Sequence, residues 1–264
     1  MQTPNFALFI ALAALVAVSS GVSAQKRGLL FPWDSVPADL SSGGFTQAKC
    51  PKAVSYIDWE SWTFSPADPA FEFIAMARTQ NDVAALATYM PTNKAKKIAF
   101  LNEPDLPGST ALPVSTAVQI WNQKIIPYRK SGIQLLSPAI TSDESKGLPW
   151  LAQFMAAVPS AKPDYIALHY YGTDATAFQT YVTEVYNLYK LPIYITEVAS
   201  TSSDITSVKA FMTGVTSWCD KQSWIAGVFW FAASRTANTG NVVQSALMSS
   251  TGARTPLGDL YCTS

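Results

Sequence analysis

The sequence predicts a single (β/α)₈ barrel, and three observations lead to this fold class. Short apolar runs alternate with amphipathic helical patterns along the chain, which is typical of a parallel sheet covered by helices. About eight such pairs follow the N-terminal segment within about 240 residues, which is the usual size of this barrel. No low-complexity tract or change of composition divides the 264-residue chain, so we expect one domain.

The expected strands and helices follow from hydrophobic periodicity. The strands are expected at residues 28–31, 54–59, 71–77, 97–103, 133–139, 164–171, 192–197 and 225–231. Apolar residues at helical spacing predict helices at 79–90, 113–130, 146–158, 176–190 and 203–219. The connections 38–50 and 62–68 are less regular, and a short helix is expected in each.

The N-terminal segment, residues 1–24, is predicted to be a signal peptide. Its apolar stretch at 7–18 is too short to span a bilayer but fits a signal-peptide core, and residues 22–24 give a small-x-small cleavage pattern. The pair Lys26-Arg27 follows as a dibasic site, so processing is expected either before Gln25 or after Arg27. We therefore expect a secreted protein, extracellular or associated with a cell wall, whose folded domain spans 28–264 and has no membrane partner.

The composition excludes some partners and favours others. Lys+Arg and Asp+Glu both number 18, and no basic run is present, so no electrostatic basis for binding nucleic acid exists. The chain is 48% hydrophobic and 14% charged, which is enough to bury a sizeable core. Its 8 Trp, 11 Tyr and 13 Phe suit contacts with flat, weakly polar surfaces. Nothing in the pattern indicates an obligate oligomer, so we expect a monomer.

The three cysteines fit an oxidising compartment, but their number is odd. We expect one disulfide through Cys262 and one free thiol, with either Cys50 or Cys219 as the partner. A cysteine nucleophile would need a paired histidine, and the only histidine lies in a different context. With no CxxC motif and no histidine pair, we expect no metal and no organic cofactor.

Two predicted strands end in a glutamate, Glu103 and Glu197. Pro104 cannot continue a central strand, so the strand is expected to end near Glu103. Barrel enzymes place their chemistry at the carboxyl ends of the strands, where strands four and seven can face each other. Paired carboxyls suit the cleavage of a glycosidic bond, with retention at a separation of about 5–5.5 Å and inversion at about 6.5–9.5 Å. The sequence does not give this distance.

Polar and aromatic residues at other strand ends are expected to bind the substrate. The amide of Asn102 is placed to bind a sugar 2-hydroxyl group. His169 is expected to orient Glu197 or to bind sugar. One of Tyr170 and Tyr171 is expected to donate a hydrogen bond to Glu197, while the other packs. The candidates for stacking on sugar rings are Trp33, Trp59, Trp62 and Trp230.

Several further carboxylates lie near strand ends. Asp34, Asp58 and Glu60 are expected at the rim, and Glu60 is the alternative catalytic group if Glu103 has another role. Asp105 is expected to anchor a loop. Residues 143–144 are expected to form a solvated acidic loop.

Three motifs together resemble the catalytic domain of glycoside hydrolase family 128, the fungal-type β-1,3-glucanases. They are Gly-Leu-Leu-Phe-Pro-Trp at 28–33, Asn-Glu-Pro-Asp at 102–105 and Ile-Thr-Glu at 195–197, and the resemblance extends from residue 28 to about residue 261. It implies retaining, double-displacement hydrolysis of β-1,3-glucan, with Glu103 as acid/base, Glu197 as nucleophile and Asn102 beside the acid. Trp230 resembles the platform tryptophan of the wider clan.

This mechanism sets expectations for the two carboxyl groups. Glu103 must be protonated to donate to the leaving oxygen, so we expect its surroundings to raise its pKa, whereas Glu197 must stay ionised. We expect endo cleavage, although the sequence leaves exo cleavage open. Two alternatives also stay open: hydrolysis of another β-glucan linkage, and an inert carbohydrate-binding wall protein. The presence of both glutamates speaks against the inert protein.

Overall fold

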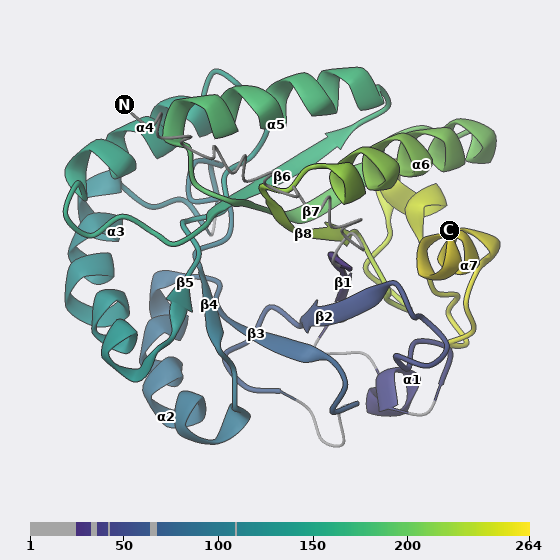
Figure 1. Cartoon of the computed structure of the whole chain (residues 1–264), viewed down its shortest axis with the longest axis horizontal. Helices are drawn as coiled ribbons and strands as arrows, with labels where there is room; N and C mark the ends of the chain where they lie inside the picture. Colours follow the sequence, from purple (N-terminus) through teal and green to yellow (C-terminus); the bar gives the residue numbers. More distant parts are fainter. Residues whose placement is uncertain (1–24, 33–35, 42, 64–67, 109) are drawn as a thin grey trace, which may run out of the picture.

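Eight parallel strands form one sheet that curls around a central axis in the computed structural model (Figure 1). The structure describes residues 25–32, 36–41, 43–63, 68–108 and 110–264. The strand order is β5-β4-β3-β2-β1-β8-β7-β6. The strands are β1 (Arg27–Leu30), β2 (Ala53–Ile57), β3 (Glu72–Ala77), β4 (Lys97–Phe100), β5 (Gln134–Leu135), β6 (Ile166–Gly172), β7 (Ile193–Ser200) and β8 (Ile225–Trp230).

The two outer strands of this order, β5 and β6, meet and close the barrel. Isolated parallel bridges join Leu136 to Tyr165 and Ile140 to Leu168. β5 is much shorter than the expected strand at 133–139, because the pairing beyond Leu135 continues only as isolated bridges at Leu136, Ala139 and Ile140. The (β/α)₈ fold class predicted from the sequence is therefore confirmed.

Helices surround the barrel and cover most strand connections (Figure 1). All five regions with helical spacing form helices, although 113–130 is divided into an α, a π and a 3₁₀ segment. The elements are α1 (Pro37–Ser41), η1 (Gln80–Asp82), α2 (Val83–Asn93), α3 (Val114–Ile120), η2 (Trp121–Ile125), η3 (Ile126–Ser131), α4 (Gly147–Ala157), α5 (Ala175–Tyr189), α6 (Ile205–Lys221), η4 (Gly240–Ser245) and α7 (Pro256–Thr263). None of the described helices is long and apolar enough to cross a membrane.

The less regular connections differ from expectation. In 38–50 only the first residues belong to a helix, α1, and the remainder forms turns. The described residues 58–63 and 68–71, between β2 and β3, contain no helix, so the helix expected at 62–68 is absent from the part that the structure describes. The sequence there has no apolar residues at helical spacing to bury against the sheet.

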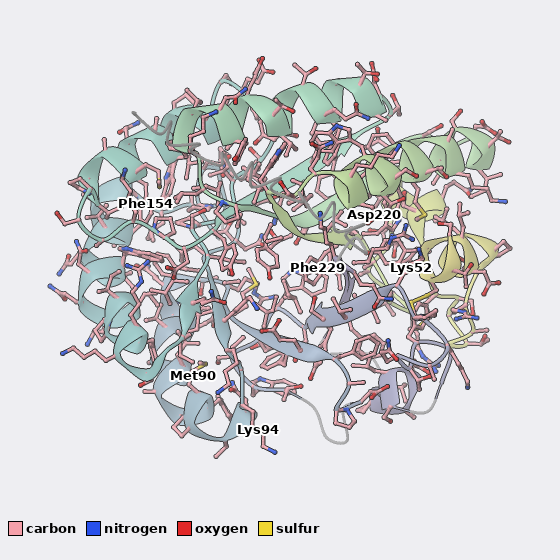
Figure 2. All side chains as sticks on the ribbon, in the orientation of Figure 1. Lys52, Met90, Lys94, Phe154, Asp220 and Phe229 are labelled. Atoms are coloured by element: carbon pink, nitrogen blue, oxygen red, sulfur yellow. A yellow bond between two sulfur atoms is a disulfide. The ribbon has the colours of Figure 1, made fainter. Side chains whose placement is uncertain are left out.

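Successive strand residues point alternately into the barrel and toward the helices, which creates two apolar layers. One layer fills the barrel and includes Tyr194 and Phe229, while the other lies between barrel and helices and includes Phe154 and Trp230. Figure 2 shows Phe229 among the strands and Phe154 on the surrounding helical layer. Gly28 on β1 makes room for Phe229, since a Cβ atom there would lie 2.0 Å from that ring.

The base of the barrel, where the strands begin, holds the start of β1 and the C-terminus together. The disulfide joins Cys50 to Cys262, which selects one of the two partners left open by the sequence, and Cys219 is a buried free thiol. Arg27 is 2% exposed; its guanidinium lies 3.2 Å from Asp220 and donates to the carbonyl oxygens of Tyr261 and Ser264. The barrel therefore begins at Arg27, one residue before the predicted strand.

Candidate active site

The segment after β4 brings Asn102 and Glu103 to the mouth of the barrel. β4 ends at Phe100, three residues before the predicted end at Glu103, because Leu101 adopts a left-handed backbone with φ 60°. Glu103 is also left-handed, with φ 45°, and its N–H donates to the carbonyl oxygen of Ala139. Left-handed non-glycine residues cost energy and cluster where function fixes the backbone.

Glu197 lies inside β7, which continues to Ser200 and is longer than the predicted strand at 192–197. The pairing with β6 shifts at this point: Leu168 pairs with Ile195, and His169 pairs with Glu197. Ile195 points toward the helices, so strict alternation would place Glu197 on that side as well. The irregularity at Thr196 instead turns Glu197 toward the mouth, as β-bulges beside active sites do.

The alternation along β6 decides which of its polar residues reach the mouth. His169 and Tyr171 point inward and contact the glutamates. Tyr170 points outward, where its ring packs against Phe178 and Phe211. Tyr170 is therefore the one of the two tyrosines that packs. The assignment of Tyr170 to substrate binding was wrong.

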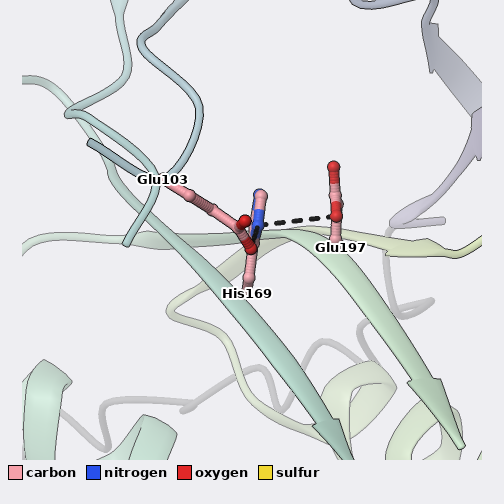
Figure 3. A group of neighbouring side chains, drawn as sticks. All are labelled: Glu103, His169 and Glu197. Atoms are coloured by element: carbon pink, nitrogen blue, oxygen red, sulfur yellow. Dashed lines mark hydrogen bonds and ion pairs between the residues drawn. The ribbon is translucent and has the colours of Figure 1, made fainter. Parts of the chain in front are cut away.

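His169 lies between the two glutamates (Figure 3). Its Nδ1 atom is 2.8 Å from Oε1 of Glu103 and 3.5 Å from Oε2 of Glu197. One carboxylate oxygen from each glutamate and a ring nitrogen of His169 all lie within 4.8 Å of one another. At least one pair of oxygens from the two carboxyl groups therefore lies within 4.8 Å, so the two groups face each other at the mouth of the barrel.

Two further donors hold the carboxylate of Glu197. The indole Nε1–H of Trp59 donates to Oε1 at 2.9 Å, and the hydroxyl of Tyr171 donates to Oε2 at 2.5 Å. Trp59 follows β2 with a left-handed backbone, φ 64°. Hydrogen bonds to both oxygens of one carboxylate fix its orientation.

Charge balance within the site sets the protonation of its groups. Burial lowers the pKa of His169, but the charges of Glu197 and Glu103 outweigh it and raise that pKa above its ordinary value. Burial raises the pKa of Glu103, but the hydrogen bond and charge of His169 hold it below its ordinary value. The expectation of a raised pKa at Glu103 was wrong for the free protein, because the sequence does not show the contact with His169.

A cleft of about 660 Å³ opens in front of the two glutamates. Its lining includes Pro32, Trp59, Arg78, Asn102, Glu103, Tyr171, Glu197, Phe231 and part of the segment 236–242. Asn102 lines the cleft, and its buried Oδ1 atom has no hydrogen-bond partner. Sequence reasoning missed Arg78, Phe231 and the 236–242 segment, although each follows a strand end and the positional rule for barrels could have found them.

The aromatic candidates divide between the cleft and the core. Trp59 lines the cleft. Trp230 is fully buried, donates through Nε1 to the carbonyl oxygen of Ser245, and cannot contact a sugar, so its assignment was wrong. Phe231, the next residue, points into the cleft instead. Trp62 lines a separate groove beside α2, away from the glutamates.

The remaining carboxylates have structural surroundings. Asp58 is buried; burial raises its pKa, and it accepts the backbone N–H of Glu60. Asp105 accepts hydrogen bonds from the N–H and the hydroxyl of Thr141, as expected for a loop anchor. Asp143 forms an exposed ion pair with Lys146. Trp33 and Asp34 lie outside the described residues.

Among the described residues, Glu103, His169 and Glu197 also form a group compact enough for a metal ion. Their proximity is accounted for by contacts between the imidazole and both carboxylates. His169 makes a hydrogen bond to Glu103 and a longer ion-pair contact with Glu197, and these two contacts hold the group together. Two facing carboxyls in an open cleft at the mouth of a (β/α)₈ barrel define a glycoside hydrolase.

The chain belongs to the family described as the glycosyl hydrolase catalytic core, whose model matches residues 36–261. It is 33% identical over 215 residues to alkali-sensitive linkage protein 1 of Schizosaccharomyces pombe, which covers 78% of this chain and 39% of that protein. The chain thus spans well under half the length of this relative.

Solved structures of glycoside hydrolase family 128 share the fold. An exo-β-1,3-glucanase of subgroup VI from Aureobasidium namibiae has a TM-score of 0.82 and 24% identity, over 92% of this chain and 98% of its own. An endo-β-1,3-glucanase of subgroup IV from Lentinula edodes has a TM-score of 0.74 and 27% identity, over 90% of this chain and 99% of its own. The resemblance read from the three sequence motifs is confirmed.

Proposed function

We propose that this chain hydrolyses β-1,3-glucan with retention of configuration, using Glu103 as acid/base and Glu197 as nucleophile. The observation that carries this proposal is that one oxygen of the Glu103 carboxylate lies within 4.8 Å of one oxygen of the Glu197 carboxylate across the cleft. Retaining enzymes need about 5–5.5 Å between these groups, and a larger gap is needed to admit the water of an inverting reaction.

The surroundings of each glutamate fit its role. Glu197 is 6% exposed and held at both oxygens by Trp59 and Tyr171, so it is oriented for attack on the anomeric carbon. The side chain of Glu103 is 17% exposed and lies on the opposite side of the cleft, where it can reach the leaving oxygen and later a water molecule.

The substrate class rests on the neighbours and on the cleft. The two solved relatives are described as β-1,3-glucanases, one endo-acting and one exo-acting. The cleft offers an unpartnered amide oxygen at Asn102, and aromatic rings at Trp59 and Phe231 whose centroids lie 5.8 Å apart. Flat rings beside hydrogen-bonding groups suit the two kinds of surface of a glucose unit. Endo cleavage by a monomer stays a prediction.

Secretion is part of this proposal, and the fold favours one of the two processing sites. The predicted signal peptide at 1–24 lies outside the described residues. Cleavage after Arg27 would remove a buried side chain that binds Asp220 and the C-terminus, and would also remove Lys26, whose ammonium donates to the carbonyl oxygen of Cys219. We therefore place the mature N-terminus at Gln25.

The test is hydrolysis of a panel of linear β-1,3-, β-1,4-, β-1,6- and mixed-linkage glucans, with the anomers of the first products followed by NMR. We expect activity on the β-1,3 polymer and release of the β-anomer first. The α-anomer first would overturn retention. Activity confined to another linkage would mean that the substrate is a glucan of that linkage, and binding without cleavage would favour an inert carbohydrate-binding protein.

Azide separates the two glutamate roles. In Glu103→Ala, azide should replace the missing base and give a β-glycosyl azide, whereas in Glu197→Ala it should replace the nucleophile and give an α-glycosyl azide. The same stereochemistry from both variants would overturn the assignment.

A further inference from the structure

We propose that His169 holds the proton that Glu103 delivers to the leaving group, and that His169 regains a proton at the end of each turnover. His169 acts through Glu103 and is a positioning residue that does not itself touch the substrate. This inference rests on the proposed function, and it assigns the source of the acid's proton.

The geometry directs the proton of His169 at Glu103. Nδ1 lies 2.8 Å from the Glu103 oxygen and 3.5 Å from the Glu197 oxygen, so the shorter contact is with the acid. His169 is 1% exposed, whereas the side chain of Glu103 is 17% exposed and lines the cleft. A proton on the imidazole therefore reaches substrate or solvent most directly through Glu103.

The charges around the imidazole explain why one proton resides there. Glu103 faces it from the segment after β4, and Glu197 faces it from β7. Asp105 adds a more distant negative charge, and Tyr171 on the same strand stays a neutral donor because burial raises its pKa. These anions outweigh burial and favour the imidazolium form, while Glu103 is left ionised.

An ionised Glu103 cannot act as an acid, so the proton must be shared by the pair. The Nδ1–H bond of His169 breaks, its electron pair stays on the nitrogen, and an O–H bond forms on Glu103. Glu103 then protonates the glycosidic oxygen while the bond from this oxygen to the anomeric carbon breaks and Glu197 bonds to that carbon. In the second step water gives a proton to Glu103 as its oxygen replaces Glu197, and that proton returns to Nδ1.

A pH profile tests this sharing. Glu103 and His169 share one proton, and a shared proton is bound at least as tightly as it would be by either group alone. Removing His169 can therefore only lower the pH above which this proton, and with it the acid, is lost. In His169→Gln we expect the basic limb of the kcat/KM profile on β-1,3-glucan to move to lower pH by about one unit or more. For each unit of this shift, the loss of kcat/KM relative to wild type should be about tenfold greater at high pH than at low pH. Loss by the same factor at every pH would overturn the proposal.

Leaving-group dependence gives a second readout. A 2,4-dinitrophenyl laminaribioside needs no proton on its leaving group, so in His169→Gln its rate of bond cleavage should fall far less than that of the glucan. Equal losses on both substrates would overturn the proposal. Tyr170→Phe is the matched control, because this neighbour on β6 points toward the helices and should keep the wild-type profile.

The charge of His169 can be measured in the wild type, which avoids any folding defect of the variant. The chain has one histidine, so untagged protein labelled with ¹⁵N-histidine gives one imidazole to follow. We expect an imidazolium at pH 6.5, because its pKa is raised from that ordinary value. A mostly neutral ring at pH 5.5 would overturn the proposal. If the wild type cleaves no β-1,3-glucan, the proposed function fails, and this titration still decides the state of His169.

Discussion

The two ends of the barrel treat buried polar groups in opposite ways. At the base, the Arg27 guanidinium meets the Asp220 carboxylate and two carbonyl oxygens, and a disulfide joins Cys50 to Cys262. At the mouth, two carboxylates lie together on one imidazole, and Leu101 and Glu103 adopt left-handed backbones.

This difference separates stability from chemistry. Base contacts join opposite charges and distant parts of the chain, which stabilises the fold. Mouth contacts place two carboxylates on a single imidazolium, which leaves one negative charge unbalanced, and the backbone there is strained; both cost stability and are retained where function requires them. Substitutions at the mouth should therefore change activity more than stability, and substitutions at the base should do the reverse.

The largest expected effect is at the mouth. Glu103→Gln keeps the shape and an acceptor for His169 but removes the acid, so activity on glucan should fall about 10²–10⁴-fold. The free energy of unfolding should change by about 1 kcal/mol or less, the net value of one hydrogen bond. Initial rates and urea denaturation measure the two effects. A loss of several kcal/mol would show that the mouth also stabilises the fold.

The next effect belongs to the base. Replacing Cys50 and Cys262 together with serine should lower the free energy of unfolding by about 2–5 kcal/mol, because the bridge closes a loop with a sequence separation of 212. Activity at 25 °C should stay at the wild-type level. Wild-type protein unfolded in the presence of a reductant is the control, and its free energy of unfolding should match that of the variant. A fall in activity before unfolding would contradict the separation of the two ends.

A smaller effect is expected at Trp59, which belongs to the mouth and supports the proposed nucleophile, Glu197, through a hydrogen bond. Trp59→Phe keeps a ring in the cleft and removes the Nε1–H bond to Glu197. A hydrogen bond to a charged group contributes about 1.5–3 kcal/mol, so kcat/KM should fall about 10–100-fold. Tyr171→Phe should behave similarly. Wild-type kinetics in both variants would mean that the orientation of Glu197 does not depend on these donors.

The smallest effect is expected at Trp62, which sequence reasoning placed among the sugar-binding residues. Trp62→Phe should leave KM on glucan within about twofold of wild type, as for a substitution away from the site. The Trp62 ring lines the groove beside α2, not the cleft. A large rise in KM would show that substrate extends to that groove.

The sequence predicted the barrel and the position of Glu103 and Glu197 at its mouth, because both depend on local signals. The apolar runs before Glu103 and Glu197 mark two strands, and Pro104 marks a point that β4 cannot pass. The positional rule for barrels then brings Glu103 and Glu197 together without knowledge of any distance.

What the sequence could not give was the side of the strand on which each residue lies. Trp230 and Phe231 are adjacent aromatics, and a shift of one residue decides which of them faces sugar. The same ambiguity affected Tyr170 and Tyr171. Glu197 reaches the mouth only through the shift in pairing at Thr196, which depends on neighbouring strands and has no local signature.

The contact between Ser264 and Arg27 at the start of β1 has a practical consequence for attachment. Both ends of the barrel domain lie on the side where the strands begin, with the cleft at the opposite end. A polypeptide linker or surface anchor joined at either end would point away from the glutamates. The hydrolase could then be tethered by its base while its mouth stays open to a long, insoluble polymer.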